Sequence, residues 1–185
     1  GFTFDWYIEM WNKARLHQAL WNSIKVGVIA SVISTFIALF AAKAFTRYKV
    51  KFSGLSYGAI LLPFIIPEII IAVAFIVIWT SMGLKLGLIP ITISHVLYCT
   101  PFCLLILISR MEGFDKSLEE ASMDLGENAF GTFWLITLPL LLPGIVASLL
   151  LSFVISFDEF ILAFFLSSSD QTLPIYMWSQ LRFPK

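Results

Sequence analysis

The sequence predicts an all-α, polytopic membrane protein, and three observations carry that prediction. The 185 residues are 59% hydrophobic and only 13% charged, with a mean hydropathy of +0.90. This is more apolar surface than one soluble core of this length can bury. Apolar runs near the length of a membrane-crossing helix recur along the chain, and short segments between them hold most of the charges.

Overall charge excludes some partners. The chain has 12 basic and 12 acidic residues and no net charge, so nothing in the balance points to nucleic acid. Its two cysteines, Cys99 and Cys103, are four residues apart within an apolar run, where disulfide geometry is poor. We expect both to be buried small hydrophobic residues.

Residues 1–23 mix aromatic and charged side chains, a composition typical of the water–membrane interface. We expect a helix lying near the membrane surface. The chain begins with Gly1 and not Met, and this segment lacks the pattern of a signal peptide, so we expect its natural beginning to be missing or processed. The aromatic residues are Trp6, Tyr7, Trp11 and Trp21, and the charged ones are Asp5, Glu9, Lys13 and Arg15.

Two predicted spans follow. Residues 24–45 are long enough for a helix that crosses about 30 Å of hydrocarbon. A second apolar run, residues 58–79, is broken by Pro63 and Pro67. Between them lies the densest basic cluster of the chain, which consists of Lys43, Arg47, Lys49 and Lys51.

Two more spans are predicted, at residues 88–109 and 138–165, and a polar tail of residues 167–185 has no further span. Residues 110–137, between these spans, are rich in acids, so this segment must be solvated or bound to protein. If the N-terminus is outside, six of the 12 basic residues fall inside, so their count does not fix the orientation. The basic cluster after the first span favours a cytoplasmic position for that loop.

The acidic segment contains a spaced motif. Glu120-Ala121-Ser122 is followed by Gly126, and then by Ile136, Leu138 and Pro139. Small residues let a helix lie closely in a groove, the glycine permits a tight reversal, and the proline marks the return to the membrane. The pattern resembles the signature loop of the permeases of binding-protein-dependent ABC importers of the MetI-like type. In that loop a second alanine occupies the position of Ser122.

The resemblance covers the whole chain and is strongest to the spermidine/putrescine branch. It implies that Glu120, Ala121, Ser122, Gly126, Ile136, Leu138 and Pro139 form a coupling helix and its return, which dock on an ATPase subunit. It also implies a bacterial inner-membrane location, a second permease subunit, an external solute-binding protein and a six-span subunit, of which the first and last spans are missing here. No phosphate-binding G-x-x-x-x-G-K-[ST] loop occurs in the sequence, so ATP and Mg²⁺ are expected on the partner and no cofactor on this chain.

Three acids lie within the predicted spans: Glu68, Asp158 and Glu159. Charged groups inside a membrane need partners or water, and separated carboxylates suit the amines of a polyamine. We expect Glu68 and at least one of the other two to line a solute pathway. Adjacent helical residues project about 100° apart, so one of Asp158 and Glu159 is expected instead to brace the helix, cap a backbone break or pair with a partner subunit.

Other interpretations stay open. Related permeases carry amino-acid derivatives, thiamine or iron, and an ion-coupled secondary transporter would use the same acids as a relay. An intramembrane enzyme would need a nucleophile and base, or a metal cluster, and none is visible. His95 has no second ligand at metal spacing and is expected to pack between helices or line a cavity. The small-residue spacing of five serines predicts close helix packing; these are Ser31, Ser34, Ser148, Ser152 and Ser156.

Overall fold

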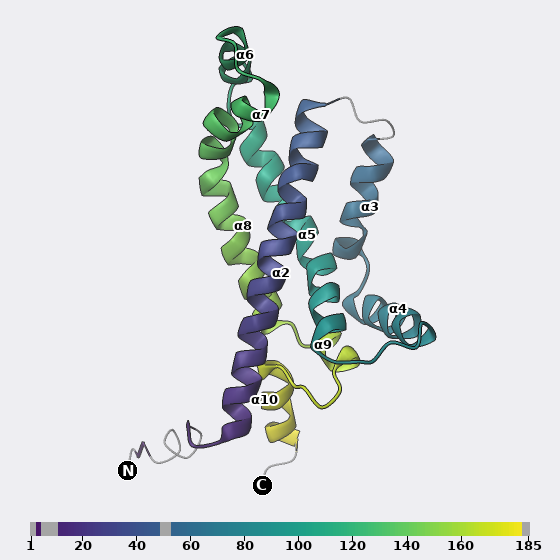
Figure 1. Cartoon of the computed structure of the whole chain (residues 1–185). Helices are drawn as coiled ribbons and strands as arrows, with labels where there is room; N and C mark the ends of the chain where they lie inside the picture. The colour runs from purple at the N-terminus through teal and green to yellow at the C-terminus, as the bar shows by residue number, and fades with distance from the viewer. Residues whose placement is uncertain (1–2, 5–10, 49–52, 183–185) are drawn as a thin grey trace.

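The computed structural model describes residues 3–4, 11–48 and 53–182, and in this part of the chain all the regular elements are helices (Figure 1). In chain order the elements are α2 Ala14–Arg47, α3 Ser53–Ile65, α4 Glu68–Ser81, α5 Leu88–Glu112, α6 Ser117–Asp124, α7 Ala129–Thr132, the π-helical turn η1 Phe133–Thr137, α8 Leu138–Asp158, α9 Ile161–Leu166 and α10 Leu173–Arg182.

Three long helices, α2, α5 and α8, pack together as the centre of the molecule. Each is long and apolar enough to cross a membrane, with α7, η1 and α8 counted as one helix of 30 residues. The predicted surface helix is not separate from the first span, because α2 runs without a break from Ala14. Residues 1–2 and 5–10, which hold Asp5, Trp6, Tyr7 and Glu9, lie outside the described residues.

Small and weakly polar residues line the contacts among these three helices. Cys103 Sγ lies 3.6 Å from Thr35 Oγ1 on α2 and 3.7 Å from the Ser148 carbonyl on α8. A β-carbon on Gly27 would lie 3.0 Å from the Phe153 ring, so α2 and α8 approach closely there. The five serines predicted to pack are all buried, and both cysteines are buried and unbridged, which confirms these two predictions.

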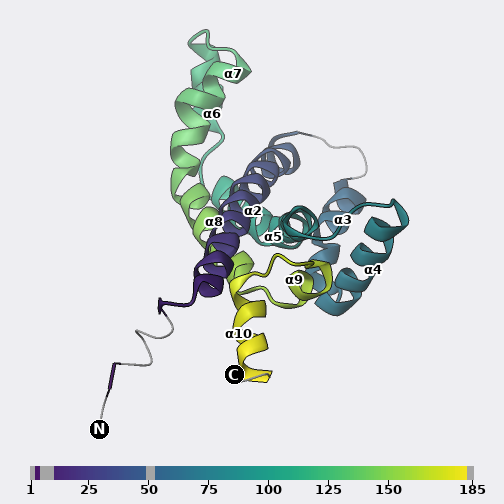
Figure 2. The ribbon, with the colours of Figure 1, turned by 60° about the horizontal axis from the view of Figure 1, so that its bottom comes forward.

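The second predicted span is two helices instead of one. The axes of α3 and α4 differ by 105°, and α4 lies at the edge of the molecule, away from α2 and α8, in both views (Figures 1 and 2). Pro67 explains the break, because a proline disfavours helical backbone at the preceding residue and has no N–H to donate. The pair accounts for a fourth crossing only if the bent segment is counted as one span.

The fourth predicted span also ends early. The helix that enters at Ala129 stops at Asp158, the backbone of Glu159 is extended, and α9 begins at Ile161. α9 packs on α4 through Leu162, which is buried with Ile71 and Ala72. α10, in the predicted tail, has ten residues and is too short to cross a bilayer.

The predicted acidic loop is largely helical. α5 extends to Glu112, α6 and α7 form a hairpin, and the helix of the last long span already begins at Ala129. Figure 1 shows this hairpin beside the C-terminal end of α2, while α10 and the first turns of α2 lie at the opposite end. The end that carries α6 is called the hairpin end below. Two residues of the basic cluster, Lys43 and Arg47, lie there, whereas Lys49 and Lys51 fall outside the described residues.

Candidate functional site

The α8–α9 break is built around Glu159. Its carboxylate accepts the backbone N–H groups of Leu162 at 3.0 Å and Ala163 at 3.2 Å, which have no partner within α9 because they lie in its first turn. The residue is only 7% exposed. The structure therefore places this acid as a cap of α9, one of the alternatives left open by the sequence, and not on an open surface.

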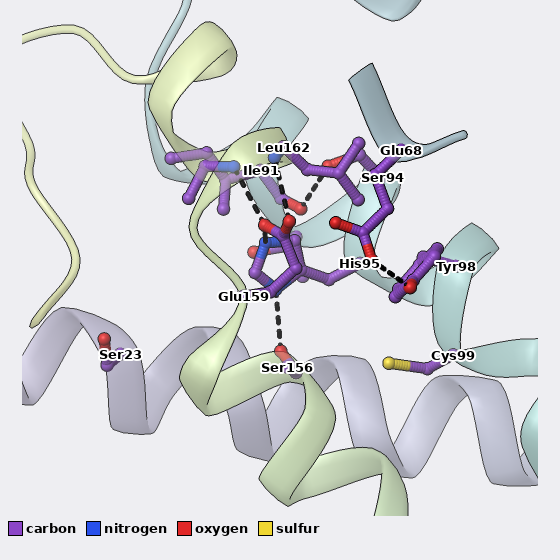
Figure 3. Close-up of polar contacts among 12 residues, drawn as sticks. Ser23, Glu68, Ile91, Ser94, His95, Tyr98, Cys99, Ser156, Glu159 and Leu162 are labelled. Atoms are coloured by element: carbon purple, nitrogen blue, oxygen red, sulfur yellow. Dashed lines mark hydrogen bonds and ion pairs between the residues drawn. The ribbon is translucent and has the colours of Figure 1, made fainter. Parts of the chain in front are cut away.

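His95 of α5 closes the other side of this carboxylate. Its Nε2 lies 3.4 Å from Glu159 Oε2, and its Nδ1 lies 2.7 Å from Ser156 Oγ on α8 (Figure 3). The imidazole is 1% exposed. The sequence predicts that His95 either packs between helices or lines a cavity. Its buried environment matches packing between helices. Sequence reasoning did not pair it with Glu159, because His95 lies on α5 and Glu159 lies much later in the chain, at the α8–α9 break.

Glu68 is the first residue of α4, directly after the α3–α4 break. The hydroxyl of Tyr98 donates to its carboxylate, and Tyr98 lies three residues after His95 on α5 (Figure 3). The first turn of a helix is a favourable place for an acid. Glu68 is half-buried, so its carboxylate combines a protein partner with access from outside the fold.

Asp158 is exposed, whereas its neighbour Glu159 is buried. Asp158 is the last residue of α8, and in the part of the chain that the structure describes its carboxylate has no hydrogen bond or ion pair. The C-terminus of a helix carries partial negative charge, so an acid there is unfavourable until a cation approaches. The expectation that Asp158 and Glu159 do not share one environment matches this geometry.

The hairpin presents an outward face at the other end of the molecule. Glu120, Ala121 and Gly126 of the motif are exposed, and Leu125 and Phe130 beside them are 89% and 72% exposed. Gly126 has φ +100°, a backbone conformation that favours glycine, which confirms the predicted reversal. Asn128 then caps α7 by accepting N–H groups of Phe130 and Gly131 at 3.0 and 2.9 Å.

The other motif residues differ in exposure: Ser122 is buried, Ile136 and Leu138 are half-buried, and Pro139 is exposed. The Ser122 hydroxyl lies 3.1 Å from Thr132 Oγ1 and joins the two arms of the hairpin. Ile136 belongs to η1, whereas Leu138 and Pro139 begin α8 and continue its helix without a loop. Pro139 is the second residue of α8 and lies directly after the π-helical turn. The return to the bundle is therefore one continuous helix from Ala129.

The turn that leads into α6 is held by Asp115. The backbone N–H of Ser117 donates to its carboxylate at 3.0 Å, and this bond lowers the pKa of Asp115 below its usual value. Among the described residues no group of three or more histidine, cysteine, aspartate or glutamate side chains is placed to hold a metal ion.

Similarity to known proteins agrees with this geometry. The family model described as "Binding-protein-dependent transport system inner membrane component" matches residues 34–183. The spermidine/putrescine transport system permease protein PotC of Escherichia coli K12 is 31% identical over 183 residues, which cover 98% of this chain and 69% of that protein. The putrescine transport system permease protein PotI of the same organism is 28% identical over 191 residues, covering 98% and 68%.

A solved structure shares the fold. It is a crystal structure of a bacterial ABC transporter involved in the import of the acidic polysaccharide alginate, and the TM-score is 0.77 at 18% identity. The match covers 95% of this chain and 61% of that one, so the present chain spans less than two thirds of its length. At this identity the likeness supports the arrangement of helices alone.

Proposed function

Because the chain belongs to the family of inner membrane components of binding-protein-dependent transport systems, we propose that it forms the solute pathway of an ATP-driven importer of polyamines or a similar small organic cation. The protein is a transport subunit of the inner membrane. The proposed complex contains a second permease subunit, ABC ATPase subunits that bind ATP and Mg²⁺, and an external solute-binding protein.

One observation carries the proposed charge of the solute: the exposed carboxylate of Asp158 at the C-terminus of α8. A cation beside it offsets both the side-chain charge and the helix dipole. Glu68 supplies a second carboxylate at the α3–α4 break. A polyamine fits two separated acids because its amines are themselves separated by apolar carbon chain. The names of the two matching relatives point to the same class of solute.

Glu159 is proposed to support the pathway and not to bind the solute. It is buried and its two oxygens already accept backbone N–H groups. Each oxygen of this carboxylate therefore already has a partner within the fold. The cap fixes where α9 begins and thereby where the preceding residue, Asp158, is presented.

The hairpin is the proposed contact with the ATPase. Its outward face is apolar at Leu125 and Phe130, and Glu120 and Ala121 are also exposed on it. Exposed apolar side chains outside the hydrocarbon are typical of a protein-binding surface. Closure of the ATPase would favour one position of the hairpin over another, so ATP binding would shift the population of pathway states.

The experiment is solute-stimulated ATP hydrolysis by the complete complex in proteoliposomes with its solute-binding protein. Wild type is compared with Asp158→Asn, which removes the charge, and with Asp158→Glu, which keeps it. We expect spermidine or putrescine to stimulate hydrolysis in wild type and in Asp158→Glu, and not in Asp158→Asn. Stimulation by another solute alone would keep the importer and reject the polyamine, and uptake that needs no ATPase would favour an ion-coupled transporter.

A further inference from the structure

Glu119, the residue before the motif, joins three separate parts of the hairpin end. One oxygen accepts from Arg47 Nε at the end of α2 at 2.6 Å, and the other accepts from Thr137 Oγ1 at the end of η1 at 2.6 Å. Glu119 is only 9% exposed, although it lies on the eight-residue α6 beside the exposed Glu120. We call these three residues, Arg47, Glu119 and Thr137, the clamp.

The clamp extends to a third long helix through Arg47. The guanidinium also donates to the Met111 carbonyl of α5 at 3.1 Å and lies 4.8 Å from the centre of the Phe114 ring. Arginine suits such a position because its planar fork binds several acceptors in fixed geometry. The ends of α2 and α5, the hairpin and the start of the last span are thus connected through the Arg47–Glu119 pair.

Close packing does not hold the hairpin on this side. A cavity of about 280 Å³ borders the clamp, and Glu119, Arg47 and Thr137 form part of its wall together with Lys43 and Lys116. Removing one partner of a buried ion pair leaves an uncompensated charge, which is strongly destabilising. Two charge-assisted hydrogen bonds, more than apolar contact, therefore fix where α6 lies relative to α2.

Thr137 occupies a special place in the backbone. It ends the π-helical turn Phe133–Thr137, which lies between the α-helical segments α7 and α8. A π-helical turn interrupts the regular hydrogen-bond ladder, and such turns are frequent at functional sites. The hairpin is therefore tied to the last span at a point where the regular α-helical hydrogen-bond pattern is interrupted.

We propose that Glu119 is the positioning residue that transmits movement of the hairpin to the bundle. In this role its carboxylate moves α2 and the π-helical turn together with α6, and does not itself bind the ATPase. The proposal rests on the proposed coupling function of the hairpin. It separates two adjacent acids: Glu120 faces outward toward a partner, and Glu119 faces inward toward the spans.

The test compares Glu119→Gln and Thr137→Val in the complete transporter, with Glu112→Gln as a matched control, since Glu112 is an exposed glutamate at the end of α5. Three quantities are measured: co-purification of the ATPase subunit, the rate of ATP hydrolysis, and solute imported per ATP. We expect the ATPase to stay bound while solute imported per ATP falls on the order of tenfold in Glu119→Gln and about threefold in Thr137→Val, because the first variant loses charge from both bonds. The control should match wild type.

Unchanged import per ATP in both variants would overturn the proposal, and so would loss of the ATPase subunit, which would make Glu119 a docking residue. If Glu119→Gln fails to assemble, Thr137→Val decides, since it keeps the Arg47–Glu119 ion pair and the shape of residue 137. A wild-type complex that imports solute without an ATPase would reject the proposed function itself, which is a separate result.

Discussion

The carboxylate of Glu159 accepts the backbone N–H of Leu162 at 3.0 Å, so the acid at the α8–α9 break caps the first turn of α9, which begins at Ile161. Its neighbour Asp158 ends α8 and is exposed. Two adjacent acids in an apolar segment thus have separate surroundings, one satisfied inside the fold and one open to a ligand. Substitutions at the two positions should therefore affect different measurements.

Removing the cap should lower stability. We expect Glu159→Ala to reduce the free energy of unfolding by about 1–2 kcal/mol, as for other lost N-caps, and Glu159→Gln to reduce it less because one acceptor oxygen remains. Thermal unfolding of the detergent-purified protein measures this. Asp158→Ala is the control and should stay within about 0.5 kcal/mol of wild type. An equal loss at both positions would contradict the capping role.

Spermidine uptake should depend more on the charge of Glu68 than on its hydrogen bond with Tyr98. We expect Glu68→Gln to lower spermidine uptake by about tenfold, equivalent to about 1.4 kcal/mol, while the complex still assembles. Tyr98→Phe removes the donor and leaves the carboxylate charged, so uptake should change little. The measurement is radiolabelled spermidine import into proteoliposomes. Equal losses in the two variants would show that the Tyr98 bond, and not the charge, is what transport needs.

Substitution of Gly126 should strain the backbone of the turn between α6 and α7. Nothing lies within 4 Å of a β-carbon built at this residue, whose φ is +100°, so Gly126→Val brings no clash but strains the turn by about 1–3 kcal/mol. We expect weaker binding of the ATPase subunit, measured by titration of the purified partner, with unchanged thermal unfolding of the spans. Glu120→Ala should weaken the same binding.

The control for this turn is Gly113→Ala. Gly113 ends α5 with φ −79°, an ordinary value for any residue, so the substitution should leave ATPase binding as in wild type. If Gly126→Val and Glu120→Ala bind the ATPase subunit as tightly as wild type does, the assignment of the coupling surface is wrong.

The α2–α8 contact gives a fourth prediction. A β-carbon on Gly27 would lie 3.0 Å from the Phe153 ring, so Gly27→Ala forces the ring to move and should cost about 1–3 kcal/mol of stability. Gly58→Ala on α3 is the comparison, because nothing lies within 4 Å of its β-carbon. That variant should be neutral or stabilising, since alanine is the better helix residue by about 0.5–1 kcal/mol. Thermal unfolding that ranks them in the reverse order would contradict this packing.

Sequence patterns predicted the long helices, the hairpin reversal and the break near Pro67, since each follows from a local property. Apolar runs of sufficient length indicate membrane-crossing helices, and Gly126 and Pro67 act through their own backbone. The 105° angle at the α3–α4 break was not predictable, because it depends on packing of α4 against α9, which lies far along the chain.

Orientation of the acids was the hardest part of the site to predict. Glu119 and Glu120 are adjacent on α6, and the inward position of Glu119 depends on Arg47, which lies 72 residues earlier. The pairing of His95 with Glu159 likewise needs α5 and α8 in register. Helical spacing shows that neighbours project in different directions, but it does not say which of them meets the partner.

The bend between α3 and α4 has a consequence for biosynthesis. With 13 and 14 residues, these helices reach only about 20 Å each, short of the hydrocarbon thickness of about 30 Å. Neither helix alone is long enough to cross the bilayer, so a crossing at this place needs both helices. Since α9, the element that buries Ile71 and Ala72 of α4, is synthesised last of these segments, the bend becomes stable only when translation of the region is nearly finished.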